Sequence, residues 1–272
     1  MPSAPTARPP DRVPAPGDHD SPGYDVRLGA QAYAPIIGNL GGFVVAAVVL
    51  VFALPRAKHG DSTLLGLGTG LLVLALISSL LAAFILAGLG AERELTPNLP
   101  AAALHAGVTA AVGVVAMVAA FEVLSAVYLP SAKPLFVMIT IGAEVASAVF
   151  VALVLGDAWL ASRNHPAKRG THWLARQEDA ARVARSASLA ATIALGLGAG
   201  LYALGVKVSL GPSGARFFVG AGIVLAIGSA LIGVLRTWHP SDGKYLGVNR
   251  TETILALGLL TAYLVMLTLC LP

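Results

Sequence analysis

Charged residues are scarce in this chain of 272 residues. Asp, Glu, Lys and Arg together make up 12% of it, whereas a soluble domain carries about 25%. Hydrophobic residues make up 56%, and the mean hydropathy is +0.78. These values exclude an ordinary soluble domain and indicate an integral membrane protein.

Cysteine is nearly absent, since Cys270 is the single one. An intramolecular disulfide and a CxxC site are therefore excluded. No spacing of His, Cys, Asp and Glu matches a metal or acid–base site, so we expect no metal and no cofactor. The net charge of +4 is spread over short loops, which argues against a nucleic-acid partner. The last apolar run lacks the lysine that a retinal protein needs.

Seven apolar runs are present, and each is close to the roughly 20 residues that cross a bilayer as a helix. The sequence predicts an all-α, polytopic membrane protein built as a bundle of seven transmembrane helices. The expected spans are 35–54, 64–89, 102–127, 134–160, 187–206, 216–235 and 252–271.

Two segments outside the spans stand apart. Residues 1–28 hold seven of the 17 prolines and are expected to form a disordered tail, which leaves 29–272 as the transmembrane domain. The one long loop, 161–188, is expected to contain an interfacial helix from Trp173 that leads into the fifth span.

The distribution of basic residues predicts the orientation. Lys and Arg sum to 13 on the side of the N-terminal tail and to five on the other side. Because positive loops stay in the cytoplasm, we expect a cytoplasmic N-terminus and an external C-terminus. The excess of Arg over Lys, with abundant Ala and Gly, favours a bacterial protein, and hence the bacterial plasma membrane.

Small residues recur at four-residue spacing within the spans. The pairs Gly66/Gly70 and Gly196/Gly200 predict close helix packing. They lie in similar segments, LGLGTGLL at 65–72 and LGLGAGLY at 195–202. This similarity raises the question of an inverted repeat relating the second to fourth spans to the fifth to seventh. The match does not extend beyond these segments.

Two glutamates, Glu122 and Glu144, lie inside the third and fourth apolar runs. An ionised carboxylate at mid-membrane costs about 2.5–3.5 kcal/mol on the insertion scale. The turn LPSAKP at 129–134 predicts a hairpin that brings the two carboxyl groups to depths differing by about 6 Å. No Lys or Arg lies deep in any run, so we expect either a proton or cation site at Glu122 and Glu144 or neutral glutamates that form hydrogen bonds between helices.

Other polar residues are expected to line the glutamate site or to contact lipid headgroups. The expected polar lining of the glutamate site is Ser78, Ser79, Thr140 and Ser147. The expected contacts to lipid headgroups are Arg163, Lys168 and Arg169. His105 is expected to be an interfacial or capping histidine at the start of the third span.

Three functions are compatible with these features. Transport of a small solute or an ion, linked to a proton or cation at the two glutamates, is the leading interpretation. A subunit of a membrane complex, or a homo-oligomer, is the first alternative, because the small-residue faces suit helix association. A membrane enzyme acting on headgroups through Asp157, His165 and His172 is the second, although no catalytic residue can be identified and a non-enzymatic role is favoured.

Overall fold

The computed structural model describes residues 26–53, 62–92, 99–163, 171–208, 210–238 and 250–271. In this part of the chain the regular elements are helices, and no strand occurs. The elements are α1 Val26–Ala53, α2 Ser62–Ala91, α3 Leu99–Tyr128, the 3₁₀ turn η1 Pro130–Ala132, α4 Lys133–Arg163, α5 Thr171–Ala203, α6 Pro212–Trp238 and α7 Arg250–Cys270.

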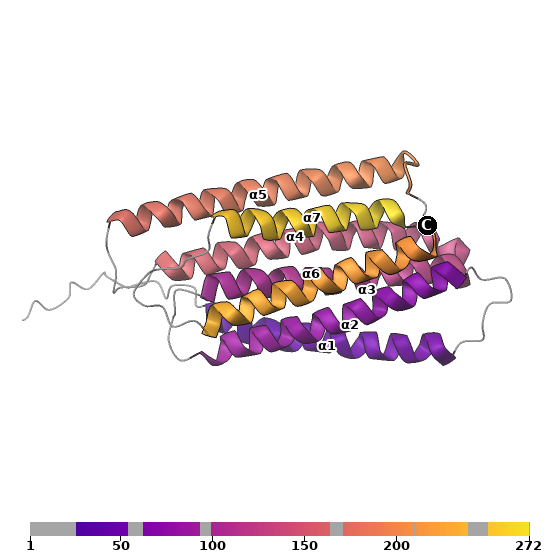
Figure 1. Cartoon of the computed structure of the whole chain (residues 1–272), viewed down its shortest axis with the longest axis horizontal. Helices are drawn as coiled ribbons and strands as arrows, with labels where there is room; N and C mark the ends of the chain where they lie inside the picture. The colour runs from indigo at the N-terminus through magenta and orange to yellow at the C-terminus, as the bar shows by residue number, and fades with distance from the viewer. Residues whose placement is uncertain are drawn as a thin grey trace, which may run out of the picture.

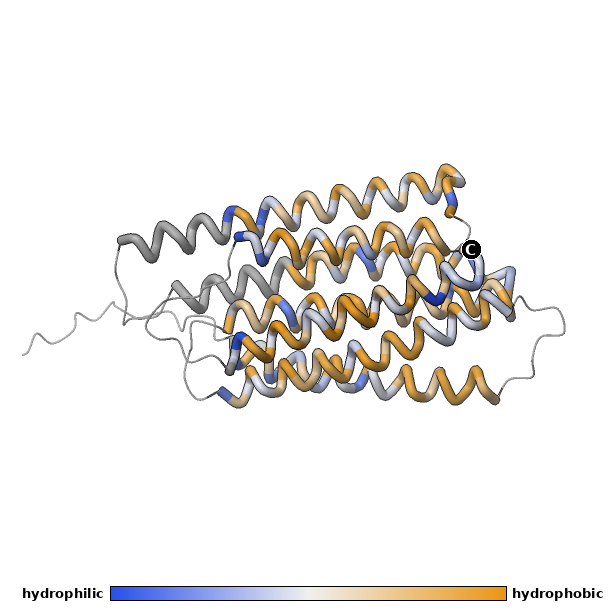
Figure 2. Tube along the Cα trace, in the orientation of Figure 1, coloured by the Kyte–Doolittle hydropathy of each residue, from blue (hydrophilic) through white to orange (hydrophobic). Residues whose placement is uncertain are grey.

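The helices run side by side along the long axis of the molecule (Figure 1). Seven of them are long and apolar enough to cross a membrane. Hydrophobic residues extend along the middle of every helix, and hydrophilic residues gather toward the ends (Figure 2). The predicted all-α bundle of seven transmembrane helices is therefore confirmed, and the chain is a multi-pass membrane protein.

Helix α3 occupies the centre of the bundle. Nearly all of its described side chains are buried, and it packs against α1, α2, α4, α6 and α7. Its sequence is mostly Ala, Val and Gly, so its neighbours can approach closely on every side. At Gly113 an added Cβ would lie 3.1 Å from the Cβ of Ser78 and 3.1 Å from Oγ of Ser79. Helix α2 therefore touches the α3 backbone at this level.

The glycine contacts differ from those predicted. A Cβ at Gly70 would contact Val219, but one at Gly66, Gly196 or Gly200 would meet nothing within 4 Å. The contact in α5 is made instead at Gly198, where an added Cβ would lie 3.2 Å from Cγ1 of Val265 on α7. The spacing rule identified helices that pack closely, but it did not identify which glycine faces the neighbour, since these helices are apolar on all sides.

The packing order does not have the symmetry of an inverted repeat. Helix α2 packs along α3, and α3 along α4. In the other half, described residues of α5 contact α4 and α7, whereas α6 packs mainly against α3 and α2. The similarity between 65–72 and 195–202 therefore does not extend to the arrangement of the helices.

Helix α1 begins at Val26, earlier than the predicted start at residue 35, and it contains Pro35. Two polar side chains of this additional segment bind the end of α2. Gln31 Nε2 donates to the Gly90 carbonyl at 2.7 Å, and Arg27 Nη1 donates to the Glu92 carbonyl at 3.3 Å. Carbonyls at a helix C-terminus lack intrahelical partners, so these bonds favour the longer helix. The remaining part of the predicted tail, 1–25, lies outside the described residues.

The expectation of a long loop over 161–188 with an interfacial helix is wrong. Helix α4 continues to Arg163, and residues 171–203 form one helix, α5, whose apolar span is Arg185–Ala203. No Gly or Pro interrupts 171–195, and its residues are mostly good helix formers, so nothing in the sequence bends the chain into the membrane plane. At about 50 Å, α5 exceeds the thickness of the hydrocarbon and extends past its neighbours (Figure 1).

Candidate functional site

Glu122 projects from α3 into the packed interior, where it is 1% exposed. Tyr202 of α5 donates its hydroxyl to Glu122 Oε1 at 3.3 Å. The Thr140 hydroxyl, on the facing turn of α4, lies within hydrogen-bonding range of the same carboxyl group. Thr140 also donates to the Phe136 carbonyl at 3.0 Å. Glu122 therefore lies where α3, α4 and α5 meet.

Glu144 of α4 is also 1% exposed. Its Oε1 lies 2.5 Å from Oγ1 of Thr268, near the end of α7. The same Thr268 oxygen lies 3.0 Å from the Leu264 carbonyl, which is the usual acceptor for a threonine inside a helix. A hydroxyl has one hydrogen, so it can donate to only one of these two oxygens. Both contacts are satisfied when Glu144 is protonated and donates to Thr268, while Thr268 donates to Leu264.

The two carboxyl groups form one site, called here the glutamate pair. The predicted hairpin is present, because α3 ends at Tyr128, η1 spans Pro130–Ala132 and α4 begins at Lys133. The carboxyl groups of Glu122 and Glu144 lie near enough to interact electrostatically. Like charges at this separation in a dry interior repel, which favours the presence of at least one proton on the pair.

Two lysines approach the pair from the hairpin end of the bundle, the end at which α3 passes into α4. Lys207 Nζ lies 4.7 Å from the centre of the Tyr202 ring, and both Lys207 and Lys133 act electrostatically on Glu122. Desolvation lowers the pKa of Lys207, the adjacent Lys133 lowers it further, and the Glu122 carboxylate opposes this effect. Among the described residues, neither glutamate forms an ion pair with a basic side chain.

The predicted lining residues are all buried but do not all lie at the pair. Thr140 lies beside Glu122, and Ser147 is buried on α4 one turn beyond Glu144. Ser78 and Ser79 pack against Gly113, about 13 Å along α3 from Glu122. The sequence reasoning missed Tyr202 and Thr268, because their positions in apolar runs give no sign of which face they occupy.

A second polar cluster lies at the end opposite the hairpin and links α3, α6 and α7. His105 is 3% exposed and lies in the second turn of α3, past the capping position, where its side chain faces the protein interior. Its Nε2 lies 3.0 Å from Oε1 of Glu252, and its Nδ1 lies 2.9 Å from Oγ of Ser229. Arg236 holds Glu252 through both oxygens, at 3.3 and 2.6 Å. We call these four residues the His105 cluster.

Ser229, His105 and Glu252 are linked by hydrogen bonds in the sequence serine–histidine–acid, as in the catalytic triad of a hydrolase. An oxyanion hole, which such an enzyme also needs, does not accompany them among the described residues. Ser229 lies in the interior of α6, where backbone N–H groups are used by the helix itself. No donor set placed to stabilise an oxyanion accompanies the serine in the described structure, as acyl transfer requires. The geometry suits a buried proton-binding group held by an ion pair better than a nucleophile.

Several predicted residues lie outside the described part of the chain. These are Lys168, Arg169, His165 and the side chains of Arg163, Asp157 and His172. Within the described residues, no group of three or more His, Cys, Asp or Glu side chains is placed to hold a metal ion.

Comparison with protein-family models, curated proteins and solved structures finds no match to this chain. Functional inference therefore depends on the glutamate pair and the His105 cluster alone.

Proposed function

We propose that this chain is a transport protein of the bacterial plasma membrane, in which the glutamate pair binds and releases a proton during passage of an ion or small solute. The single observation that carries the proposal is the position of Thr268 between Glu144 and the Leu264 carbonyl. That arrangement suits a protonated Glu144. A carboxyl group inside the membrane is costly compared with an apolar side chain, and its ability to bind and release a proton explains its presence.

A proton fits the site better than a metal cation. The groups around the pair are two carboxyls and the hydroxyls of Tyr202, Thr140 and Thr268, two of which already donate to backbone carbonyls. Hard metal cations require about six or more oxygen ligands. The ammonium groups of Lys133 and Lys207 also disfavour a cation approaching from the hairpin end.

Reaction with a hydrophobic carbodiimide tests the proposal without knowledge of the solute. The reagent adds to protonated carboxyl groups in apolar surroundings. We expect mass spectrometry to find the adduct on Glu144 or Glu122, with a yield that falls as the bulk pH rises, because a transport carboxyl must exchange protons with water. The same reaction on Glu144→Gln should give no adduct at position 144, as read by fragmentation of the peptide, since Asp157 lies on the same helix.

The second candidate is a subunit of a membrane complex, and the burial of both carboxyl groups to 1% exposure favours it. A neutral glutamate sealed between helices can serve as a hydrogen bond worth only about 0.6–2 kcal/mol. Carbodiimide labelling that is absent, or that does not change with pH, would support this role and contradict transport. Purification with bound partner proteins would then be the informative measurement.

The proposed orientation places the hairpin end outside the cell, since the N-terminal side carries more basic residues. A reporter that is active only outside the cytoplasm, fused after Pro272, should therefore be active. A reporter that is active only in the cytoplasm should be silent at the same position. The reverse pattern would mean that the glutamate pair faces the cytoplasmic half of the membrane.

A further inference from the structure

Two hydroxyl groups in the core of the bundle have no hydrogen-bond partner among the described residues. They are Oγ of Ser78, in a residue that is 0% exposed, and the phenolic oxygen of Tyr263, in a residue that is 8% exposed. An unpaired buried hydroxyl costs free energy, and native structures usually satisfy such groups through protein or bound water. These two hydroxyls therefore mark a place where a polar ligand is needed.

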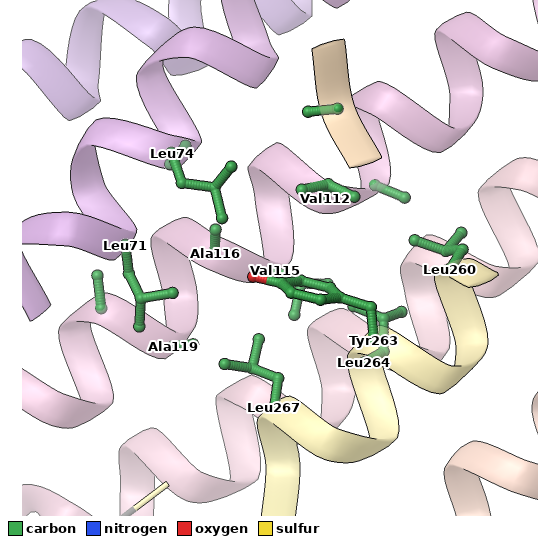
Figure 3. Close-up of a cluster of buried hydrophobic side chains, with 14 of the residues drawn as sticks. Leu71, Leu74, Val112, Val115, Ala116, Ala119, Leu260, Tyr263, Leu264 and Leu267 are labelled. Carbon is green, nitrogen blue, oxygen red and sulfur yellow. The ribbon is translucent and has the colours of Figure 1, made fainter. Parts of the chain in front are cut away.

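Both hydroxyls lie at the same level of the central helix. Ser78 packs against Gly113 of α3. Tyr263 extends from α7 into the cluster of Leu71, Leu74, Val112, Val115 and Ala116, with its oxygen deep inside (Figure 3). The tyrosine ring stacks on Phe218 at 4.9 Å between centroids, which fixes its direction. The absence of a side chain at Gly222 leaves the space that the hydroxyl occupies.

This level lies midway between the glutamate pair and the His105 cluster. Gly113 is about 12 Å from His105 and about 13 Å from Glu122 along α3. Thr109, one turn from His105, is fully buried and donates to the His105 carbonyl at 2.8 Å. Buried polar groups thus recur along α3 from one end of the bundle to the other, through a core that is otherwise apolar.

We propose that Tyr263 and Ser78 bind water in the centre of the bundle and so complete a proton path along α3, from the glutamate pair to the His105 cluster. The inference rests on the proposed function and extends it, because it names the route and the second proton site. A hydroxyl can accept a proton from one water while it donates its own to another, so no net charge remains on it. The path requires chains of water molecules over the intervals of about 12 Å between levels, because direct hydrogen bonds cannot span them.

Tyr263→Phe tests the relay, because it removes the oxygen and keeps the ring. In proteoliposomes with a pH gradient, we expect proton flux to fall about 100-fold, at the lower end of the range for loss of a proton-transfer group. We expect the melting temperature to stay near that of the wild type, since phenylalanine keeps the ring and its stack on Phe218. Tyr33→Phe makes the same change on α1, where Tyr33 packs edge-on against Phe150, and should preserve flux.

Water at this level can be tested separately from activity. Ser78→Cys in a Cys270→Ala background places a thiol at the site, and infrared spectroscopy follows exchange of S–H to S–D in heavy water. We expect fast exchange for this thiol and slow exchange for Ala75→Cys in the same background, because Ala75 is 0% exposed and lies one turn away in apolar surroundings.

Either of two results would overturn the path. They are unchanged flux in Tyr263→Phe and equal exchange of the two thiols. If these occur while Glu144→Gln still abolishes flux, the path is wrong and the transport function stands. If the wild-type protein conducts no protons and its carboxyl groups do not react with carbodiimide, the transport function itself is wrong.

Discussion

Glu144→Gln is expected to abolish proton flux through the reconstituted protein, with a loss of about 100-fold or more, as for removal of an essential proton-transfer group. The substitution should not disturb the fold. A glutamine amide has the shape of a protonated glutamate, and its N–H can donate to Oγ1 of Thr268 while Thr268 continues to donate to the Leu264 carbonyl. The variant thus keeps both hydrogen bonds and loses only the acidic proton that the carboxyl group can release.

The measurement is the rate at which a pH-sensitive dye inside the liposomes responds to an external acid pulse. A potassium ionophore should be present, so that charge build-up does not limit the flux. Glu92→Gln is the matched control, because it makes the same chemical change at the end of α2, beyond the span that ends at Ala91. Equal flux in wild type and Glu144→Gln, at equal melting temperature, would mean that Glu144 is only a hydrogen-bond link between α4 and α7.

Gly222→Val is expected to cause a large loss of stability. An added Cβ would meet the Tyr263 hydroxyl, and it would lie 2.8 Å from Cζ of Tyr263 and 2.5 Å from Cδ2 of Leu74. The tyrosine ring is held by its stack on Phe218, so it cannot move aside without opening the contact between α6 and α7. Overpacking of this kind costs about 1–3 kcal/mol, and valine adds two further methyl groups.

Thermal unfolding in detergent measures the effect, and we expect a lower melting temperature and reduced yield. Gly220→Val is the control on the same helix, since a Cβ at Gly220 would meet nothing within 4 Å. That variant should unfold near the wild-type temperature. A Gly222→Val protein as stable as the control would show that α6 is free to move away from α7, and that the position of Tyr263 is not fixed.

The elements of the bundle follow from the sequence more directly than the contacts between them do. Prolines at 130 and 134 predict the turn between α3 and α4, and the structure has a 3₁₀ turn there. The helical rotation could not be predicted, because α2 and α3 are apolar on every side and give no preferred face. For that reason Glu122 and Glu144 could be identified as candidates, but Tyr202 and Thr268 could not be identified as their partners.

The His105 cluster shows where more could have been predicted. Arg236 lies in the last turn of α6 and Glu252 in the first turn of α7, so consecutive antiparallel helices bring opposite charges to the same end of the bundle. The opposite charges on the two sides of residues 239–249 could therefore have predicted the ion pair between Arg236 and Glu252. The addition of His105 and Ser229 to this pair depends on the packing of α3 against α6, which no local pattern specifies.

The composition of α3 limits how the molecule can change shape. Alanine and glycine have no rotamers to exchange, and valine inside a helix has one strongly preferred rotamer, so the surface that α3 presents to its neighbours is almost invariant. Most of the surface of α3 therefore supplies no side chain that could act as a gate. We expect a state in which the glutamate pair meets bulk water to involve displacement of outer helices across α3. In the described part of the chain α5 contacts the fewest other helices, α4 and α7, so we expect it to be the helix that moves.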